Sequence, residues 1–246
     1  MNISFPFDPL KRSEETERLV MKGEKRLYHK FRAAPYYRGI ATADAIGCSF
    51  LCAYCWSYRR NENPVGFGRF FSAEEVAANL LRLARQRWLE LFRVTGSEPI
   101  LGPSSLRHLL HVIEIIQRQK PHAKFILETN GLVLGYQPEF ASQLMRDGLL
   151  IRIAIKGVDP VSFEKITGAG ADFFPLPLRA LQTLEQLGVH VWPALMADLF
   201  GEAEIVRFKK VLREYRIRAE LELESLEPYP FVLENMRRRG LVLRNA

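Results

Sequence analysis

The sequence has few cysteines, few histidines and no long apolar run, and each shortage excludes a class of protein. Its 246 residues include three cysteines and five histidines. An odd number of cysteines does not make a disulfide framework. No apolar stretch reaches the length of about eighteen residues that a membrane-spanning helix needs. Residues 1–20 also lack the charged-then-apolar order of a signal peptide. We therefore expect a cytoplasmic protein with no membrane partner, in a compartment where thiols stay reduced.

The composition is that of a globular protein with an excess of positive charge. Hydrophobic residues make up 48% of the chain, which is enough for a full core. The net charge of +7 permits an anionic partner but does not require one. A chain of this length forms one or two domains, and α/β barrels of this size are often one.

All three cysteines lie in one short segment. Cys48, Cys52 and Cys55 have the spacing C-x3-C-x2-C, with Tyr54 before the last. Structural zinc needs four protein ligands, and no histidine lies nearby in sequence. Three soft thiolates suit a four-iron cluster in which one iron lacks a protein ligand and can bind a small molecule. A non-catalytic iron–sulfur or zinc-binding module is the alternative, and buried cysteines that act as small apolar residues are another.

The cysteine motif resembles the signature of the radical S-adenosylmethionine (SAM) enzymes. The resemblance implies that Cys48, Cys52 and Cys55 hold a [4Fe–4S] cluster and are its catalytic ligands, and that SAM chelates the fourth iron through its amino and carboxylate groups. One electron from the cluster then cleaves the sulfonium, and the resulting 5′-deoxyadenosyl radical takes a hydrogen from the substrate. Tyr54 would place its backbone near the adenine.

The segment after the second predicted strand resembles a SAM-binding motif of the same family. Thr95-Gly96-Ser97-Glu98-Pro99 is similar to the Gly-Gly-Glu-Pro segment, with Ser97 in place of the second glycine. In the family this segment contacts the methionyl amino group. The resemblance implies that Gly96, Ser97 and Glu98 bind SAM, although on its own the segment is an ordinary turn.

Two later segments resemble motifs of the glycyl-radical-enzyme activating enzymes. Thr129 and Asn130 belong to a Thr-Asn-Gly motif that implies contacts with the ribose and methionyl end of SAM. Lys156 ends a strand that resembles their Asp-x-Lys motif, and a cation there would pair with the SAM carboxylate. Ala154 replaces the aspartate of that motif, so we expect no auxiliary cation site. With no second group of cysteines, we also expect no auxiliary cluster.

From residue 39 onward the pattern alternates between strand and helix. This alternation predicts parallel strands joined by crossover helices. The fold class is therefore α/β, a partial (β/α)6 TIM-type barrel of parallel strands with an N-terminal helical extension and a short C-terminal tail; an open doubly wound sheet is the alternative. The predicted strands are 40–46, 91–95, 124–129, 149–155, 189–195 and 217–223. The predicted helices are 72–88, with a Ser72 cap and Glu75 in capping-box position, 104–120, 138–147, 202–215, and one or two short ones within 160–187.

Three parts of the chain are expected. Residues 1–38 form a basic extension with a helix over Lys11–Arg32, residues 39–226 form the barrel core, and residues 227–246 form a basic tail with Arg237, Arg238 and Arg239. We expect the extension to be a solvated helix packed on the outside of the barrel. The alternative is a surface that attracts a polyanion.

Strand alternation also predicts which side chains face the barrel lumen. In the strand 149–155 the isoleucines would meet the helices, and Arg152, Ala154 and Lys156 would face inward. The other inward positions are Lys124, Ile126 and Glu128, His190, Trp192 and Ala194, and Glu220, Glu222 and Glu224. A charged lumen is costly unless it is wet, paired or filled by a ligand.

The motif set is closest to the glycyl-radical-enzyme activating enzymes. That resemblance implies a flavodoxin or ferredoxin as electron donor and a glycine loop of a partner protein as substrate. Modification of a tRNA or a nucleotide is the alternative, because Arg59, Arg60 and Arg69 follow the cysteines and three arginines lie in the tail.

Overall fold

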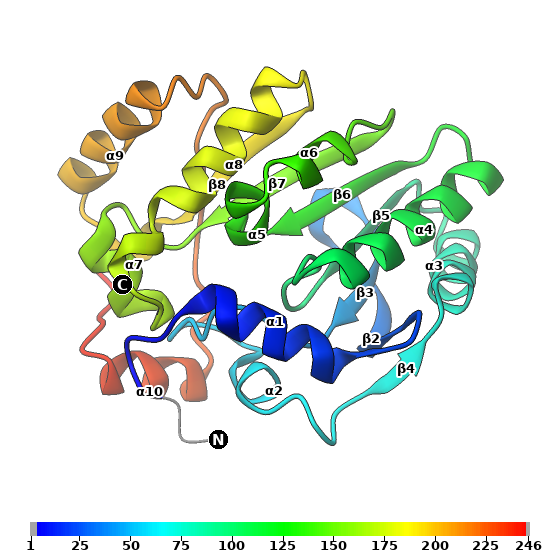
Figure 1. Cartoon of the computed structure of the whole chain (residues 1–246), viewed down its shortest axis with the longest axis horizontal. Coiled ribbons are helices and arrows are strands. Elements are labelled where there is room, and N and C mark those ends of the chain that lie inside the picture. The colour runs from blue at the N-terminus through cyan, green and yellow to red at the C-terminus, as the bar shows by residue number, and fades with distance from the viewer. Residues whose placement is uncertain (1–3, 245–246) are drawn as a thin grey trace.

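The body of the protein is an unclosed sheet of six parallel strands with helices on its outer face (Figure 1). The computed structural model describes residues 4–244. The parallel strands pair in the order β3 (Ile40–Ala45), β5 (Leu91–Thr95), β6 (Lys124–Thr129), β7 (Leu149–Ile155), β8 (Val191–Met196) and β9 (Glu222–Glu224). β9 lies at one edge of the sheet and does not pair with the strands at the other edge. The predicted partial (β/α)6 arrangement is therefore confirmed.

The outer helices follow the strands in alternation. They are α3 (Ala73–Arg87), α4 (Pro103–Gln119), α5 (Leu132–Tyr136), α6 (Glu139–Ser142), α7 (Pro160–Thr167), α8 (Pro175–Gln186) and α9 (Glu202–Glu214). Three short 3-10 turns lie at Tyr36–Arg38, Ala171–Phe173 and Ala197–Leu199. The predicted start of α3 is confirmed, because Ser72 and Glu75 form both hydrogen bonds of a capping box.

The predicted N-terminal helix over Lys11–Arg32 is wrong beyond Val20. α1 (Pro9–Val20) is followed by a hairpin of β1 (Met21–Lys22) and β2 (Lys25–Ala34). Gly23 has a φ of +60°, which a two-residue hairpin loop requires at this position. β2 pairs antiparallel with β3, and β4 (Arg69–Phe71) pairs antiparallel with β2. The extension thus adds an antiparallel edge to the sheet.

Two other predicted elements differ from the structure. The helix expected over 138–147 is replaced by α5 and α6, because Asn130 Oδ1 accepts the Leu132 N–H and starts a helix earlier, and Pro138 interrupts it. The strand expected over 217–223 is shortened to β9. The N–H groups of Arg218 and Ala219 donate to the Glu185 carboxylate instead of to β8.

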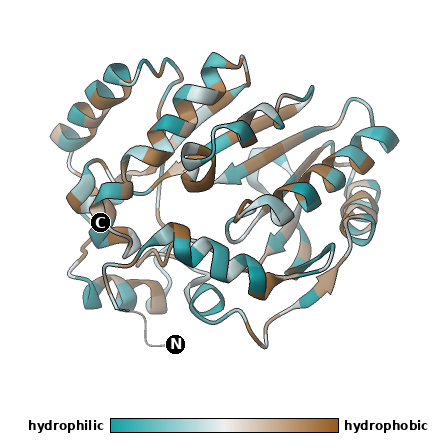
Figure 2. Ribbon diagram, viewed as in Figure 1, coloured by the Kyte–Doolittle hydropathy of each residue, from teal (hydrophilic) through white to brown (hydrophobic). Residues whose placement is uncertain are grey.

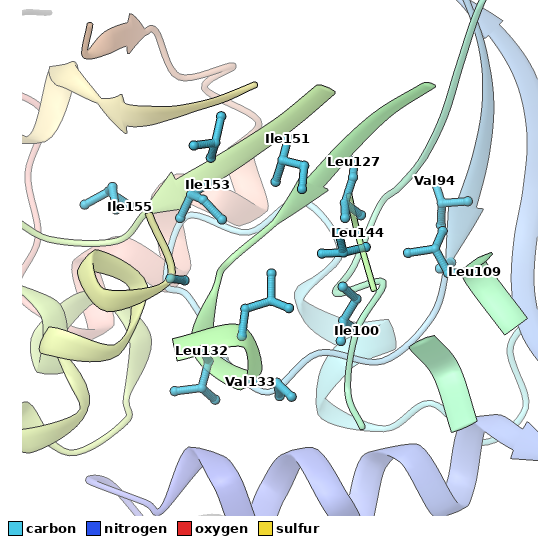
Figure 3. Close-up of a cluster of buried hydrophobic side chains, with 14 of the residues drawn as sticks. Val94, Ile100, Leu109, Leu127, Leu132, Val133, Leu144, Ile151, Ile153 and Ile155 are labelled. Atoms are coloured by element: carbon cyan, nitrogen blue, oxygen red, sulfur yellow. The ribbon is translucent and has the colours of Figure 1, made fainter. Parts of the chain in front are cut away.

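The outward face of the sheet forms the main core. Val94, Leu127, Ile151, Ile153 and Ile155 are all buried and point toward the helices (Figure 3). This confirms that the isoleucines of β7 meet the helices. Figure 2 shows apolar residues along β6 and β7 and a mostly hydrophilic α1.

The inward face is layered. At the amino ends of the strands Ile40 and Ile126 are buried against Leu91, Leu150 and Trp192, which closes the bottom of the lumen with apolar side chains. Two residues further along β5, β6 and β7, the next inward side chains are charged, namely Arg93, Glu128 and Arg152.

The charged layer is paired, which is one of the three states that the sequence allows for a charged lumen. Arg93 Nη1 lies 2.6 Å from Glu128 Oε1. Arg152 Nη2 lies 3.0 Å from Glu222 Oε1 and 2.8 Å from Glu224 Oε2. These pairs satisfy buried charges and tie β5 to β6 and β7 to β9. Lys124, in contrast, is exposed at the start of β6.

Two short helices complete the chain. α2 (Tyr58–Glu62) follows the cysteines, in a stretch where the sequence predicts neither helix nor strand, and α10 (Pro230–Arg238) lies in the tail. α10 packs through buried Val232 and Met236, and Arg239, which follows it, donates to Ile166 O at 3.1 Å, so the tail lies against the end of α7. Within residues 4–244, no helix combines the length and the apolar character that crossing a membrane requires.

Candidate active site

The three cysteines lie on a loop at the carboxyl end of β3. The loop is held to the end of α7, because Leu51 N donates to Thr167 O at 3.0 Å and Ala53 N to Ile166 O at 2.8 Å. The carboxyl ends of parallel strands meet at the same edge of a barrel, where barrel enzymes place their sites. The loop therefore begins in the position expected for an active site.

Gly47 begins the loop beneath α1. Its φ is +95°, and a Cβ there would lie 2.7 Å from Thr16 Cγ2 and 2.9 Å from Val20 Cγ1. Both the backbone conformation and the contact with α1 thus require glycine. The N-terminal segment packs directly on the start of the cysteine loop.

N–H groups point at the sulfur atoms. Phe50 N lies 3.4 Å from Cys48 Sγ, and Ser57 N lies 3.3 Å from Cys55 Sγ. The Asn61 Nδ2 amide lies 3.7 Å from Cys55 Sγ. The Asn130 Nδ2 amide lies 3.9 Å from Cys48 Sγ. Donors to sulfur favour the negative charge of a thiolate and are typical of iron–sulfur ligands.

All three thiols are free and lie close enough to affect one another. Burial raises the pKa of each, that of Cys52 to about 11. After burial, Glu98 and then Cys52 raise the pKa of Cys48, and Cys55 raises that of Cys52. The free thiols are therefore protonated at neutral pH, and metal binding must release their protons. Among residues 4–244, no three or more His, Cys, Asp or Glu side chains are grouped closely enough to hold a single metal ion.

Lys156 brings a positive charge to the loop. Its Nζ lies 5.3 Å from the centroid of the buried Tyr54 ring, at the end of β7. Burial disfavours the ammonium, but Tyr54, Cys52 and Glu224 favour it more strongly and raise the pKa of Lys156. The site thus places a lysine ammonium beside the cysteine loop.

Glu98 joins two of the sequence-predicted segments. Its Oε1 accepts hydrogen bonds from Thr129 Oγ1 at 2.6 Å and Ile100 N at 3.0 Å, and its Oε2 accepts one from Asn130 N at 2.7 Å. The side chain is buried, and this burial raises its pKa while the hydrogen bonds oppose the rise. Glu98 N also donates to Gly47 O at 3.0 Å. Glu98, Thr129 and Asn130 are therefore brought together with the start of the cysteine loop.

Gly96 and Ser97 remain half-buried next to this group. Ser97 Oγ lies 2.6 Å from Oδ1 of Asn61, the same residue whose amide nitrogen faces Cys55. Asn61 is itself buried and belongs to none of the motifs recognised in the sequence. Its position six residues after Cys55 carries no recognisable motif, so only the tertiary contacts show its place in the site.

The comparisons with known proteins agree with this geometry. The family model described as "Radical SAM superfamily" matches residues 45–209. The chain therefore belongs to the radical SAM superfamily, whose enzymes use a [4Fe–4S] cluster and SAM.

Its relatives within that superfamily have different activities. The chain is 27% identical over 182 residues to a GTP 3′,8-cyclase of Syntrophomonas wolfei, covering 73% of this chain and 52% of the relative. It is 29% identical over 152 residues to a pyruvate formate-lyase-activating enzyme of Clostridium pasteurianum, covering 59% and 56%. The chain spans about half the length of the curated relatives it matches.

The fold is also that of solved radical SAM structures. A variant of spore photoproduct lyase, with bound AdoMet and a dinucleoside spore photoproduct, matches with a TM-score of 0.61 at 14% identity. The match covers 88% of this chain and 65% of that one. At this identity the likeness establishes the partial barrel alone.

Proposed function

We propose that this chain is the catalytic barrel of a radical SAM enzyme, in which Cys48, Cys52 and Cys55 bind one [4Fe–4S] cluster and SAM occupies the open iron. The main support is the placement of all three free thiols on one loop at the carboxyl edge of an unclosed barrel. N–H donors face two of the sulfur atoms, and Lys156 supplies a fixed cation. When bound, the cluster would supply the electron that cleaves SAM to a 5′-deoxyadenosyl radical.

The side chains around the loop fit the parts of SAM in different ways. Lys156 would pair with its carboxylate, and the Tyr54 backbone would lie by its adenine. The exposed parts of Gly96 and Ser97 are available for direct contact. Glu98 and Thr129 are mutually hydrogen bonded, so they would act mainly by fixing the Asn130 segment, with the remaining lone pair of Glu98 Oε2 free to accept the SAM amino group.

We propose a glycyl-radical enzyme as the substrate, with flavodoxin or ferredoxin as the electron donor and the cytoplasm as the location. The pyruvate formate-lyase-activating relative and the Lys156 and Asn130 motifs support this choice. In the unclosed barrel a peptide loop can enter from the side, and the wall it would meet carries the Arg152 pair.

A nucleotide or tRNA is the second candidate, favoured by the surface next to Cys55. There the Arg60 guanidinium lies 4.9 Å from the ring centroid of exposed Trp56, and Arg59 is exposed. Stacked arginine and aromatic groups suit bases and phosphates. The GTP 3′,8-cyclase relatives support the same substrate class. In the tail, however, Arg237 and Arg238 already pair with Glu234.

Anaerobic reconstitution tests the proposed function. With iron, sulfide, SAM and dithionite, the protein should release 5′-deoxyadenosine, and Cys52→Ala should abolish the release. A protein that holds a cluster but never cleaves SAM would be a non-catalytic module. Binding to tRNA that weakens steeply with salt would favour the second candidate, and no tRNA binding at low salt would remove it.

A further inference from the structure

Two buried arginines reach the cysteine loop from the segment before the barrel. Arg12 lies in α1 and Arg26 lies in β2, and neither belongs to the six parallel strands or to any SAM motif. Both carry side-chain nitrogens that are buried without a hydrogen-bond partner among residues 4–244. A buried, incompletely bonded guanidinium is costly, so its retention calls for a compensating charge.

Arg26 contacts Glu98, whose own N–H donates to the carbonyl of Gly47, the residue before Cys48. Its side chain is 1% exposed, and its Nη2 donates to Glu98 O at 2.6 Å, while Nε and Nη1 have no partner within the described residues. Burial lowers the pKa of Arg26, and Tyr28, Glu98, Glu17 and Cys48 oppose that effect. The nearby carboxylates bond elsewhere, Glu17 to Ser105 and Glu98 to Thr129. Arg26 thus has spare donors and is linked through Glu98 to the start of the cysteine loop.

Arg12 approaches the loop through Asn61. Its Nη2 donates to Asn61 O at 2.5 Å, and the Asn61 amide nitrogen lies 3.7 Å from Cys55 Sγ. Arg12 Nε is buried and unpartnered in the part of the chain that the structure describes. Burial lowers the pKa of Arg12, and Cys48 is the strongest influence against that effect. A second cation is therefore placed near the same thiols from a different element.

We propose that Arg12 and Arg26 are positioning residues of the redox centre, which offset the negative charge of the thiolate-bound cluster and raise its reduction potential. The inference rests on the proposed function. Reduction adds one negative charge to a buried group, so a fixed cation nearby stabilises the reduced state more than the oxidised state. Net charge and hydrogen bonds near the cluster are the means by which a protein sets such a potential. The N-terminal segment is then part of the electron-accepting site.

Redox titration followed by electron paramagnetic resonance tests the proposal on the reconstituted full chain. Arg12→Met and Arg26→Met should each shift the midpoint potential to more negative values, and the double variant should shift it further. Arg18→Met is the matched control, because Arg18 lies on the same helix, changes the net charge equally and is 76% exposed. It should leave the potential unchanged. If Arg12→Met and Arg26→Met both have the same midpoint potential as Arg18→Met, the proposal is overturned.

Charge-retaining variants separate an electrostatic role from a packing role. Arg12→Lys and Arg26→Lys keep the charge but lose the guanidinium geometry, and their potentials should stay near that of the wild type. If they shift as far as the methionine variants, charge is not the cause and the proposal fails. Should Arg26→Met not fold by circular dichroism, the Arg12 pair decides alone. A wild type without any cluster signal would refute the proposed function itself, whereas a normal cluster with unchanged variant potentials refutes only this inference.

Discussion

Two buried side chains outside the cysteine motif, Asn61 and Glu98, help to hold the cysteine loop in place. Asn61 contacts Cys55, Ser97 and Arg12, and Glu98 contacts the segments that end β3, β5 and β6. These two residues link parts of the chain that no local motif connects.

Lys156→Met should weaken SAM binding. Loss of a charge-assisted hydrogen bond costs about 1.5–3 kcal/mol, so the dissociation constant should rise roughly tenfold to a hundredfold. Calorimetric titration of the reconstituted protein with SAM measures it. Lys124→Met, which removes an exposed lysine at the start of β6, is the control and should bind like the wild type. Equal affinity in both variants would contradict the assignment of Lys156.

His108 should make the cluster-free protein less stable in mild acid. Nδ1 lies 3.0 Å from Glu24 O and Nε2 lies 3.1 Å from Tyr28 Oη. Burial lowers the pKa of this ring from 6.5 to about 4, so between these values the unfolded chain binds a proton that the folded chain does not. The stabilisation is complete above pH 6.5 and is lost as the pH falls toward 4, with a loss on the order of 2 kcal/mol at pH 5.

Urea unfolding at pH 7 and pH 5 measures this loss. His108→Gln should reduce the difference between the two pH values, whereas His111→Gln, on the exposed side of the same helix, should leave it unchanged. A wild-type stability that is equal at both pH values would show that His108 is not held neutral.

At the scale of elements, the sequence predicts what local chemistry determines. The Ser72–Glu75 capping box fixes the start of α3, and apolar alternation fixes β5, β6 and β7. The hairpin at Gly23 lies inside the stretch for which the sequence predicts one continuous helix, so the local pattern does not locate it. β9 begins later than the sequence predicts, because the carboxylate of Glu185, which is distant in sequence, accepts hydrogen bonds from the N–H groups of residues 218 and 219.

The candidate site also contains residues that the local sequence can identify and residues that only the fold brings in. Cys48, Cys52 and Cys55 could be proposed from their spacing alone, and Glu98, Asn130 and Lys156 from the resemblance of their segments to SAM-binding motifs. Arg12, Arg26 and Asn61 could not, because only tertiary contacts bring them to the loop. In sequence they look like ordinary polar surface residues.

The contact between α1 and the cysteine loop should make Gly47→Ala more damaging than an ordinary glycine substitution. A non-glycine residue at positive φ costs about 1–3 kcal/mol, and crowding in a packed region adds about 1–3 kcal/mol. Gly188→Ala is the control, since its φ is +73° and nothing lies within 4 Å of its added Cβ. Urea unfolding should show a larger loss for Gly47→Ala. Equal losses would mean that α1 can move away from the loop.

At the scale of the whole molecule, the barrel and the cysteine loop differ in how they are stabilised. The sheet and outer helices share a continuous apolar core. The cysteine loop joins that core through Phe50, Ala53 and Tyr54, but residues 47–57 form no helix or strand, and two backbone hydrogen bonds tie them to the end of α7. Stability in such a molecule is not uniform.

Removing the cluster should therefore loosen the loop region more than the barrel. Anaerobic hydrogen exchange should show faster exchange over residues 47–62 after chelation, with little change in β5, β6 and β7. The melting temperature should fall, by about 2–4 °C for each kcal/mol of lost stabilisation in a chain of this size. Cys48→Ser, never loaded with cluster, should resemble the chelated wild type. Equal exchange in both states would show that the loop is fixed without metal.

The placement of Arg12 and Arg26 limits how this barrel could be exchanged between proteins. The family match begins at residue 45, but both arginines come from earlier in the chain, and Arg239, which donates to Ile166 O where the loop is anchored, comes from after its end. A chimera that transplants residues 45–209 alone would keep the cysteine motif and the segments that resemble SAM-binding motifs, and would lose three cations. In such a chimera the charges around the cysteine loop would come from the host protein. Its reduction potential would therefore follow the host and not the donor.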